Sequence, residues 1–168
     1  MRVMIRPHSL AVGSLYLFSL FVHAGCGSGG GAEHRGDPNA VQVTGSVTLD
    51  SKPVVGATVY FSPMGPGISP AMGATDGSGE YVLVHGTGKP GASAGAYRVH
   101  IEYYTKPDGS PILEPNPEAG EDIEQMKIAG TAKPGLSERY MNSKLSILKA
   151  EIEPGKRNKI DFPLDTKK

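Results

Sequence analysis

One serine lies in the pattern that many hydrolases use for a nucleophile. Gly91-Ala92-Ser93-Ala94-Gly95 matches G-x-S-x-G, in which a sharp turn between a strand and a helix presents the serine hydroxyl to a histidine base. Here a turn-rich loop precedes Ser93 and a predicted strand follows it. The only later histidine is His100, and no acidic residue separates it from Ser93. The pattern therefore predicts a turn rather than a nucleophile.

A second group of polar residues alternates like the first ligands of a calcium loop. Asp76, Ser78 and Glu80 are two positions apart, but Tyr81 and Thr87 occupy the positions where an EF-hand needs glycine and its last glutamate. The stretch favours a turn, with a weak metal site as the alternative. The histidines have no zinc-ligand spacing and no cofactor-binding motif occurs, so neither a metal nor a cofactor is expected.

The chain begins like an exported protein. Arg2 and Arg6 precede an uncharged apolar run over residues 10–22, which is shorter than the roughly 20 residues that span a bilayer. Small residues follow this run. This order predicts an N-terminal signal helix, residues 1–25, that is removed after export, with an uncleaved anchor as the alternative.

The single cysteine, Cys26, comes directly after this segment. Ala24-Gly25-Cys26 resembles the lipobox of bacterial lipoproteins, in which the peptidase cuts between Gly25 and an acylated Cys26, although His23 stands where an aliphatic residue is usual. Cleavage after Ala24 by an ordinary signal peptidase is the alternative. We expect lipid attachment at Cys26, because no second cysteine is present to form an internal disulfide in an oxidising compartment.

The composition of the chain distinguishes a linker from a folded domain. Residues 26–40 are rich in glycine and lack apolar periodicity, which predicts a flexible linker. The 17 basic residues balance the 17 acidic ones, so no nucleic-acid partner is expected. With 23 glycines and 14 prolines, the chain has the composition of a turn-rich β protein.

Residues 41–165 show the strand period of two, followed by a tail at 166–168. In the first segment Val43, Val47 and Leu49 alternate with hydroxylated residues, and the same period recurs over 57–61, 81–84, 96–104, 148–153 and 160–164. With a hairpin predicted over 74–81, we count about seven strands. The pattern predicts an all-β fold, a seven-stranded antiparallel β-sandwich.

One long segment, 105–138, interrupts this pattern. It is rich in proline and acidic residues, which is typical of a functional or poorly ordered loop. Within it, residues 118–128 predict a short helix whose acidic start suits the helix dipole. Ile123, Met126 and Ile128 are its expected docking residues.

The motifs of the β domain are similar to those of a known family. VTGSV (43–47), DSKP (50–53), VGATV (55–59) and TDGSGEY (75–81) resemble the carboxypeptidase regulatory-like domains, and Ser51 departs from their pattern at a usual turn glycine. The resemblance implies a transthyretin-like, or prealbumin-like, sandwich. It also implies an accessory or binding role on exported proteins, with no active-site residues to carry over.

These observations favour a non-enzymatic, membrane-anchored lipoprotein whose monomeric domain binds a protein or polysaccharide partner. Gly27 follows the cysteine where an inner-membrane retention signal would resemble Asp, which favours the outer membrane, facing the periplasm or the cell surface. The alternative is a small secreted hydrolase, or an accessory domain of an envelope enzyme, with a site near the 105–138 loop.

Overall fold

The computed structural model describes residues 40–113 and 122–166. The predicted signal peptide, Gly25, Cys26 and the linker up to residue 39 lie outside these ranges.

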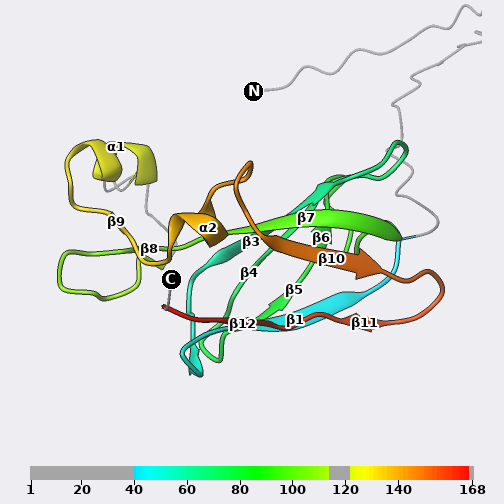
Figure 1. Cartoon of the computed structure of the whole chain (residues 1–168), viewed down its shortest axis with the longest axis horizontal. Coiled ribbons are helices and arrows are strands. Elements are labelled where there is room, and N and C mark those ends of the chain that lie inside the picture. Colours follow the sequence, from blue (N-terminus) through cyan, green and yellow to red (C-terminus); the bar gives the residue numbers. More distant parts are fainter. Residues whose placement is uncertain (1–39, 114–121, 167–168) are drawn as a thin grey trace, which may run out of the picture. The chain divides into compact units, whose positions relative to one another are not determined.

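The described residues form mainly strands (Figure 1), so the all-β fold class is confirmed. The strands are β1 (Val43–Leu49), β2 (Lys52–Pro53), β3 (Thr58–Pro63), β4 (Ala71–Ala74), β5 (Glu80–Val82), β6 (Val84–His85), β7 (Gly95–Glu102), β8 (Tyr104–Thr105), β9 (Lys133–Pro134), β10 (Leu148–Ile152), β11 (Asn158–Lys159) and β12 (Phe162–Leu164). The helices are α1 (Ile123–Ile128) and α2 (Glu138–Met141).

Sheet 1 is built around β1. This strand pairs in parallel with β11 and β12, and antiparallel with β2 and β5. Thr44 pairs both with Lys159 of β11 and with Val82 of β5, so these partners lie on opposite sides of β1. The backbone N–H and hydroxyl of Ser46 both donate to Asp161 Oδ1 at 2.9 Å, which fixes the C-terminal segment beside β1.

Sheet 2 has the order β10-β7-β3-β4-β6, and all of its pairs are antiparallel. The antiparallel prediction thus holds for sheet 2 and is wrong at β1. The physical reason is that the last segment of the chain returns beside β1 in the same direction, instead of forming a hairpin with it. A two-stranded ribbon of β8 and β9 lies beyond the end of β7 (Figure 1).

The predicted number of seven strands is not confirmed, because single segments change partners along their length. Over residues 80–85 the chain first pairs with β1, as β5, and then with β4, as β6. A strand that passes from one sheet to another in this way forms a corner between them.

For the same reason, the hairpin predicted over 74–81, with its second strand continuing to residue 84, is only partly formed: Val84 pairs with Met72 of β4, but residues 80–82 pair with β1. The turn itself is present, since Asp76 N–H donates to Glu80 O at 2.8 Å and Gly79 N–H donates to Asp76 O at 3.0 Å. However, β4 pairs with β3 and β6, whereas β5 pairs with β1. The turn therefore connects the two sheets.

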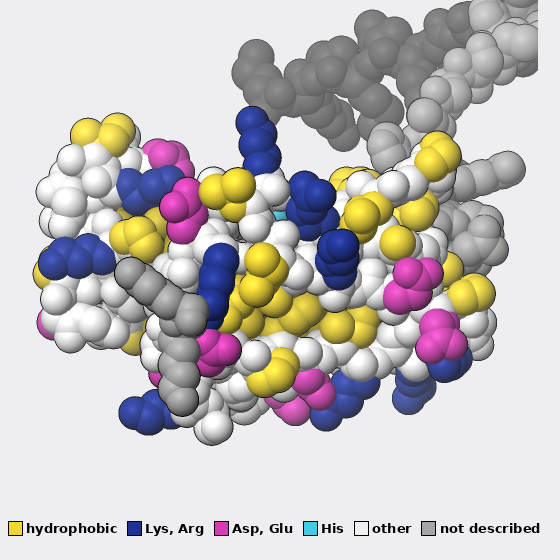
Figure 2. Space-filling view, in the orientation of Figure 1, with side chains coloured by type: hydrophobic (Ala, Val, Ile, Leu, Met, Phe, Trp, Pro, Cys, Tyr) yellow, Lys and Arg dark blue, Asp and Glu magenta, His cyan; other side chains and the backbone are white. Residues whose placement is uncertain are grey.

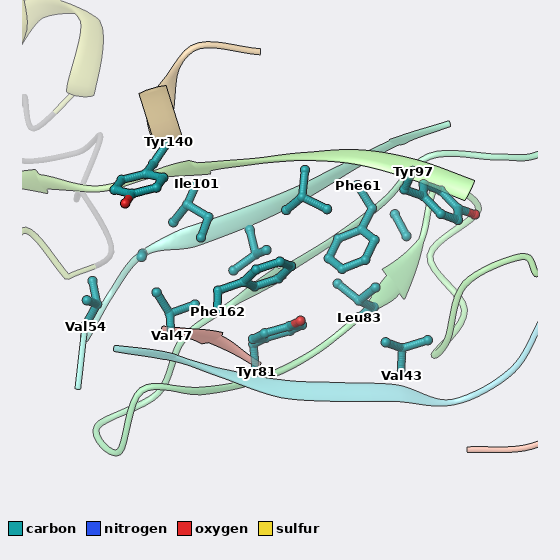
Figure 3. Close-up of a cluster of buried hydrophobic side chains, with 14 of the residues drawn as sticks. Val43, Val47, Val54, Phe61, Tyr81, Leu83, Tyr97, Ile101, Tyr140 and Phe162 are labelled. Carbon is teal, nitrogen blue, oxygen red and sulfur yellow. The ribbon is translucent and has the colours of Figure 1, made fainter. Parts of the chain in front are cut away.

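The hydrophobic core lies between the two sheets. The inward residues of β1 and β7 alternate with less buried ones, as the period of two predicts. At the centre, the Phe61 ring lies 5.6 Å from Tyr97, 6.1 Å from Phe162 and 6.4 Å from Tyr81, measured between ring centroids (Figure 3). These offset and edge-on contacts are the favourable arrangements for aromatic rings.

The core is only partly covered along one edge. Figure 2 shows a band of hydrophobic side chains between the regions where Figure 1 places β10 and β12. Leu148, Ala150 and Ile160 pack against the core while remaining partly exposed. The two sheets are therefore open at this edge rather than closed into a barrel.

Gly45 is the point where three strands meet most closely. A Cβ atom at Gly45 would lie 1.7 Å from the carbonyl oxygen of Ile160 and 2.8 Å from the hydroxyl of Tyr81. Tyr81 pairs with Gly45 across the sheet, and its buried hydroxyl donates to Ile160 O at 2.7 Å. The absent side chain thus lets Tyr81 reach past β1 to the C-terminal segment.

The turn between β1 and β2 has an unusual backbone. Asp50 and Ser51 have φ angles of 47° and 67°, which are left-handed values for two residues with side chains. Such a two-residue turn matches the twist of its strands but normally contains glycine. Ser51 stands where a turn glycine is usual, and its left-handed backbone shows that the turn keeps the same geometry without the glycine.

The 105–138 segment is only partly the loop that its composition predicts. It contains Thr105 of β8, the whole of α1 and β9, and the first residue of α2, and residues 114–121 lie outside the described ranges. Asp122 caps α1 by accepting from the N–H groups of Glu124 and Gln125. The predicted docking is wrong for Ile128, which is 88% exposed, whereas Ile123 and Met126 are partly buried and no residue of α1 is fully buried.

Candidate functional site

The serine of the G-x-S-x-G pattern is buried in a loop between β6 and β7. Ser93 contacts a histidine that precedes it, His85, rather than the later His100. Thr87 N–H donates to His85 Nδ1 at 3.2 Å, the Thr87 hydroxyl lies 2.9 Å from the same nitrogen, and His85 Nε2 lies 3.2 Å from Ser93 Oγ. Both side chains are almost fully buried, and the pair holds the loop together.

The Asp76, Ser78 and Glu80 group forms a turn. Asp76 Oδ1 accepts from the Ser78 N–H at 2.8 Å, the Ser78 hydroxyl at 2.7 Å and the Glu80 N–H at 3.0 Å. These hydrogen bonds, that of the Ser78 hydroxyl first, lower the pKa of the Asp76 carboxyl, so it stays ionised. In the described ranges, no cluster of three or more His, Cys, Asp or Glu residues is placed to hold a metal ion.

A cavity lies on the outer face of sheet 2, the face turned away from the core. We call it the outer-sheet pocket; its volume is about 870 Å³. Strand β3 provides one wall through Thr58 and Tyr60, and β7 provides Glu102. The Asp76 turn borders one side. Tyr104, Ile112, Leu113 and Ile123 come from the segment that follows β7.

The strand register brings the polar residues of this face together. Thr58 pairs with Glu102, and Tyr60 pairs with His100. The Tyr60 and His100 rings stack with their centroids 4.7 Å apart and their planes 7° from parallel. His100 is on the outward side of β7, but its side chain is only 12% exposed.

Burial controls the charge of this cluster. It lowers the pKa of His100, and the nearby Glu102 carboxylate only partly opposes this shift. It also raises the pKa of Tyr60, with smaller contributions from Glu102 and Tyr104. Both rings are therefore neutral at pH 7. His100 Nδ1 is buried and has no hydrogen-bond partner among the described residues.

The His100–Glu102 pair lies beside the 105–138 segment, where a hydrolase site would be expected. His100 Nε2 is 3.9 Å from Glu102 Oε1, which exceeds a hydrogen bond. Among the described residues, no hydroxyl group is hydrogen-bonded to His100, so the usual contact between a nucleophile and its base is not formed. The cluster has the chemistry of a binding surface: aromatic faces, apolar walls and a carboxylate.

A second, smaller hollow of about 370 Å³ lies on the other side of Tyr60. It is lined by residues of β3, β4 and β6, among them Met72 and Val84. Met72 pairs with both Tyr60 and Val84, so a row of Val84, Met72, Tyr60 and His100 crosses four strands. Met72 is 53% exposed, which makes this row an accessible apolar surface.

Sequence reasoning located part of this site. The outward position of His100 and Glu102 on one strand follows from the period of two, but Tyr60 as their neighbour depends on the register between β3 and β7.

Among the described residues, no helix is long and apolar enough to cross a membrane. The chain matches no family model, and no curated protein and no solved structure matches it significantly.

Proposed function

We propose that this protein is a non-enzymatic envelope lipoprotein whose β domain is a binding module, with the outer-sheet pocket as its binding site. The observation that carries this proposal is the pocket itself. It combines the stacked Tyr60–His100 pair, the Glu102 carboxylate and apolar walls, while the polar contacts that catalysis needs are not formed. Concave, largely apolar surfaces with a few polar groups are the usual form of ligand sites.

The fold supports the resemblance to carboxypeptidase regulatory-like domains. We infer a prealbumin-like sandwich from two sheets that face each other across one core. The motif residues have definite structural roles in it: Gly45 permits the close approach of three strands, Asp76 organises the turn between sheets, and Tyr81 joins β5 to the C-terminal segment. Such roles explain why these residue types occur in the motif.

The anchor is proposed from the sequence. A signal peptide, a lone cysteine and a Gly-rich linker are the parts of a lipoprotein in which Cys26 holds the domain at a membrane, here the outer membrane, facing the periplasm or the surface. A protein that carries more than one acyl group is retained much more firmly than one with a single acyl group.

We expect the Cys26→Ser variant to lose fatty-acid labelling and to leave the membrane fraction. The measurement is incorporation of labelled palmitate, followed by partitioning between detergent and aqueous phases. Ser93→Ala serves as a labelling control because its hydroxyl lies in the folded domain. If Cys26→Ser partitions with detergent as the native protein does, the lipid anchor is wrong.

We expect the Tyr60→Ala variant to lose the partner that the native protein captures from envelope extracts. Tyr60 contributes to both hollows and to the stack with His100, so its removal takes away the shared wall of the binding surface. The measurement is affinity capture with mass spectrometry. Val82→Ala, an exposed change on sheet 1, should capture the same partners as the native protein. Equal capture by Tyr60→Ala would overturn the pocket as the binding site.

A second candidate function rests on one observation. The His100–Glu102 pair beside the 105–138 segment is what a small envelope hydrolase would place there. This candidate requires hydrolytic turnover by the purified protein that is lost in His100→Phe, a variant that keeps an aromatic ring against Tyr60. Binding without turnover favours the module.

A further inference from the structure

We propose that the outer-sheet pocket binds a cationic side chain, lysine or arginine, presented by a basic segment of a partner protein. This inference rests on the proposed binding function and names its ligand class. It follows from charge complementarity: the described lining holds two carboxylates, Asp76 and Glu102, and neither lysine nor arginine. The pocket is therefore an aromatic and apolar site with a negative wall.

Glu102 is the group in this wall whose charge is least compensated. Among the described residues its carboxylate accepts no hydrogen bond, and the one ion-pair contact of that carboxylate is with His100, at 3.9 Å. His100 is neutral at pH 7, since burial lowers its pKa, and so it does not balance the carboxylate. A ligand cation at this position would gain an ion pair in a partly desolvated site, where such a pair is worth more than on an open surface.

The aromatic residues add a second attraction for a cation. Tyr60 and Tyr104 both line the pocket, and positively charged groups are attracted to the faces of such rings. The chain already contains one example, since Lys127 Nζ lies 5.2 Å from the centre of the Tyr104 ring. Lys127 is paired with Glu124 at 2.8 Å, so it contributes no net positive charge to the pocket.

The apolar residues indicate what carries the cation. Ile112, Leu113 and Ile123 form a wall beside the tyrosines. The methylene stem of a lysine or arginine packs against such a surface while its charged end reaches a carboxylate. A volume of about 870 Å³ leaves room for the residues that flank the basic side chain, which favours a peptide segment over a free amine.

The test uses full-length protein in non-ionic detergent and a dye-labelled trilysine peptide with blocked ends, followed by fluorescence anisotropy. We expect saturable binding that weakens when salt is raised from about 50 to about 500 mM, because screening reduces attraction between partly exposed charges. Glu102→Gln should weaken binding about fivefold, as expected for the loss of one partly exposed ion pair. Glu151→Gln is the matched control, because Glu151 is exposed on β10 of the same sheet and is not among the residues that line the pocket.

A second variant and a second ligand complete the test. Tyr104→Leu should also weaken trilysine binding, since it removes a ring while keeping an apolar side chain. A neutral N-acetylglucosamine trimer should not bind. If trilysine fails to bind, or if Glu102→Gln and Glu151→Gln bind it equally, the cationic ligand is wrong.

The outcomes also separate this inference from the proposed function. Loss of the captured partner by Tyr60→Ala, without trilysine binding, would leave the module in place and overturn only the ligand class. Binding of the sugar trimer that is abolished by Tyr60→Ala would assign the pocket to a polysaccharide and overturn the cationic ligand. Equal partner capture by native protein and Tyr60→Ala would overturn the function on which the inference rests.

Discussion

The Gly45→Ala variant is expected to lose about 3 kcal/mol or more of its free energy of unfolding, because the added methyl group has no space. Its Cβ atom would lie 1.7 Å from the carbonyl oxygen of Ile160, which belongs to the backbone of the neighbouring segment and cannot rotate away. The C-terminal segment must separate from β1, which also disturbs the hydrogen bond from Tyr81 to Ile160 O. Urea denaturation measures the loss.

Gly77→Ala is the matched control for this prediction. Gly77 lies in the turn after Asp76, has no positive φ angle, and has no neighbouring atom within 4 Å of the position that a Cβ atom would take. The same chemical change should therefore alter the free energy of unfolding by less than about 0.5 kcal/mol. Equal stability of Gly45→Ala and the native protein would show that the three strands do not approach as described.

The Phe61→Ala variant is expected to lose about 3–5 kcal/mol, the usual cost of removing a buried phenylalanine. Phe61 is only 1% exposed, and its ring contacts those of Tyr81, Tyr97 and Phe162, which come from both sheets. Its removal leaves a cavity at the point where the sheets pack together. Since domains of this size are stable by about 5–15 kcal/mol, this loss removes a large share of the free energy of unfolding.

The neighbouring residue provides the control. Tyr60 lies on the same strand but points to the outer face, where it lines the pocket instead of the core. Tyr60→Ala should therefore cost less stability than Phe61→Ala when both variants are compared with the native protein by urea denaturation, and it should remain folded while it loses its partner. A larger loss for Tyr60→Ala would contradict the assignment of the two faces of β3.

The alternation of residue types was sufficient to predict the longest strands and their buried faces. In β1 and β7 a side chain's direction depends only on its position along the strand, so Val43, Val47 and Tyr97 could be assigned to the core from sequence. The partners of the strands could not be assigned in this way. The switch of residues 80–85 from β1 to β4 depends on the packing of two sheets.

The candidate site, too, could be predicted from the sequence only in part. Glu102 could be placed on the outward face of its strand, but its pocket also requires the register with β3 and the return of Ile112, Leu113 and Ile123 over that face. The contact between Ser93 and His85 is similarly a product of the loop fold, since the sequence pattern directs attention to the later His100. Long-range register carries no local sequence signal.

The parallel pairing of β1 with β11 and β12 affects when the domain can fold. Ser46 and Asp161, which connect these segments, are 115 positions apart, so the first strand of the domain obtains its neighbour from the last part of the chain. Contacts over such distances form late and slow the folding of β proteins. During synthesis, sheet 1 therefore stays incomplete until Leu164 has emerged. Sheet 2 contains neither β11 nor β12, so the last step in completing the domain is the docking of the C-terminal segment along β1.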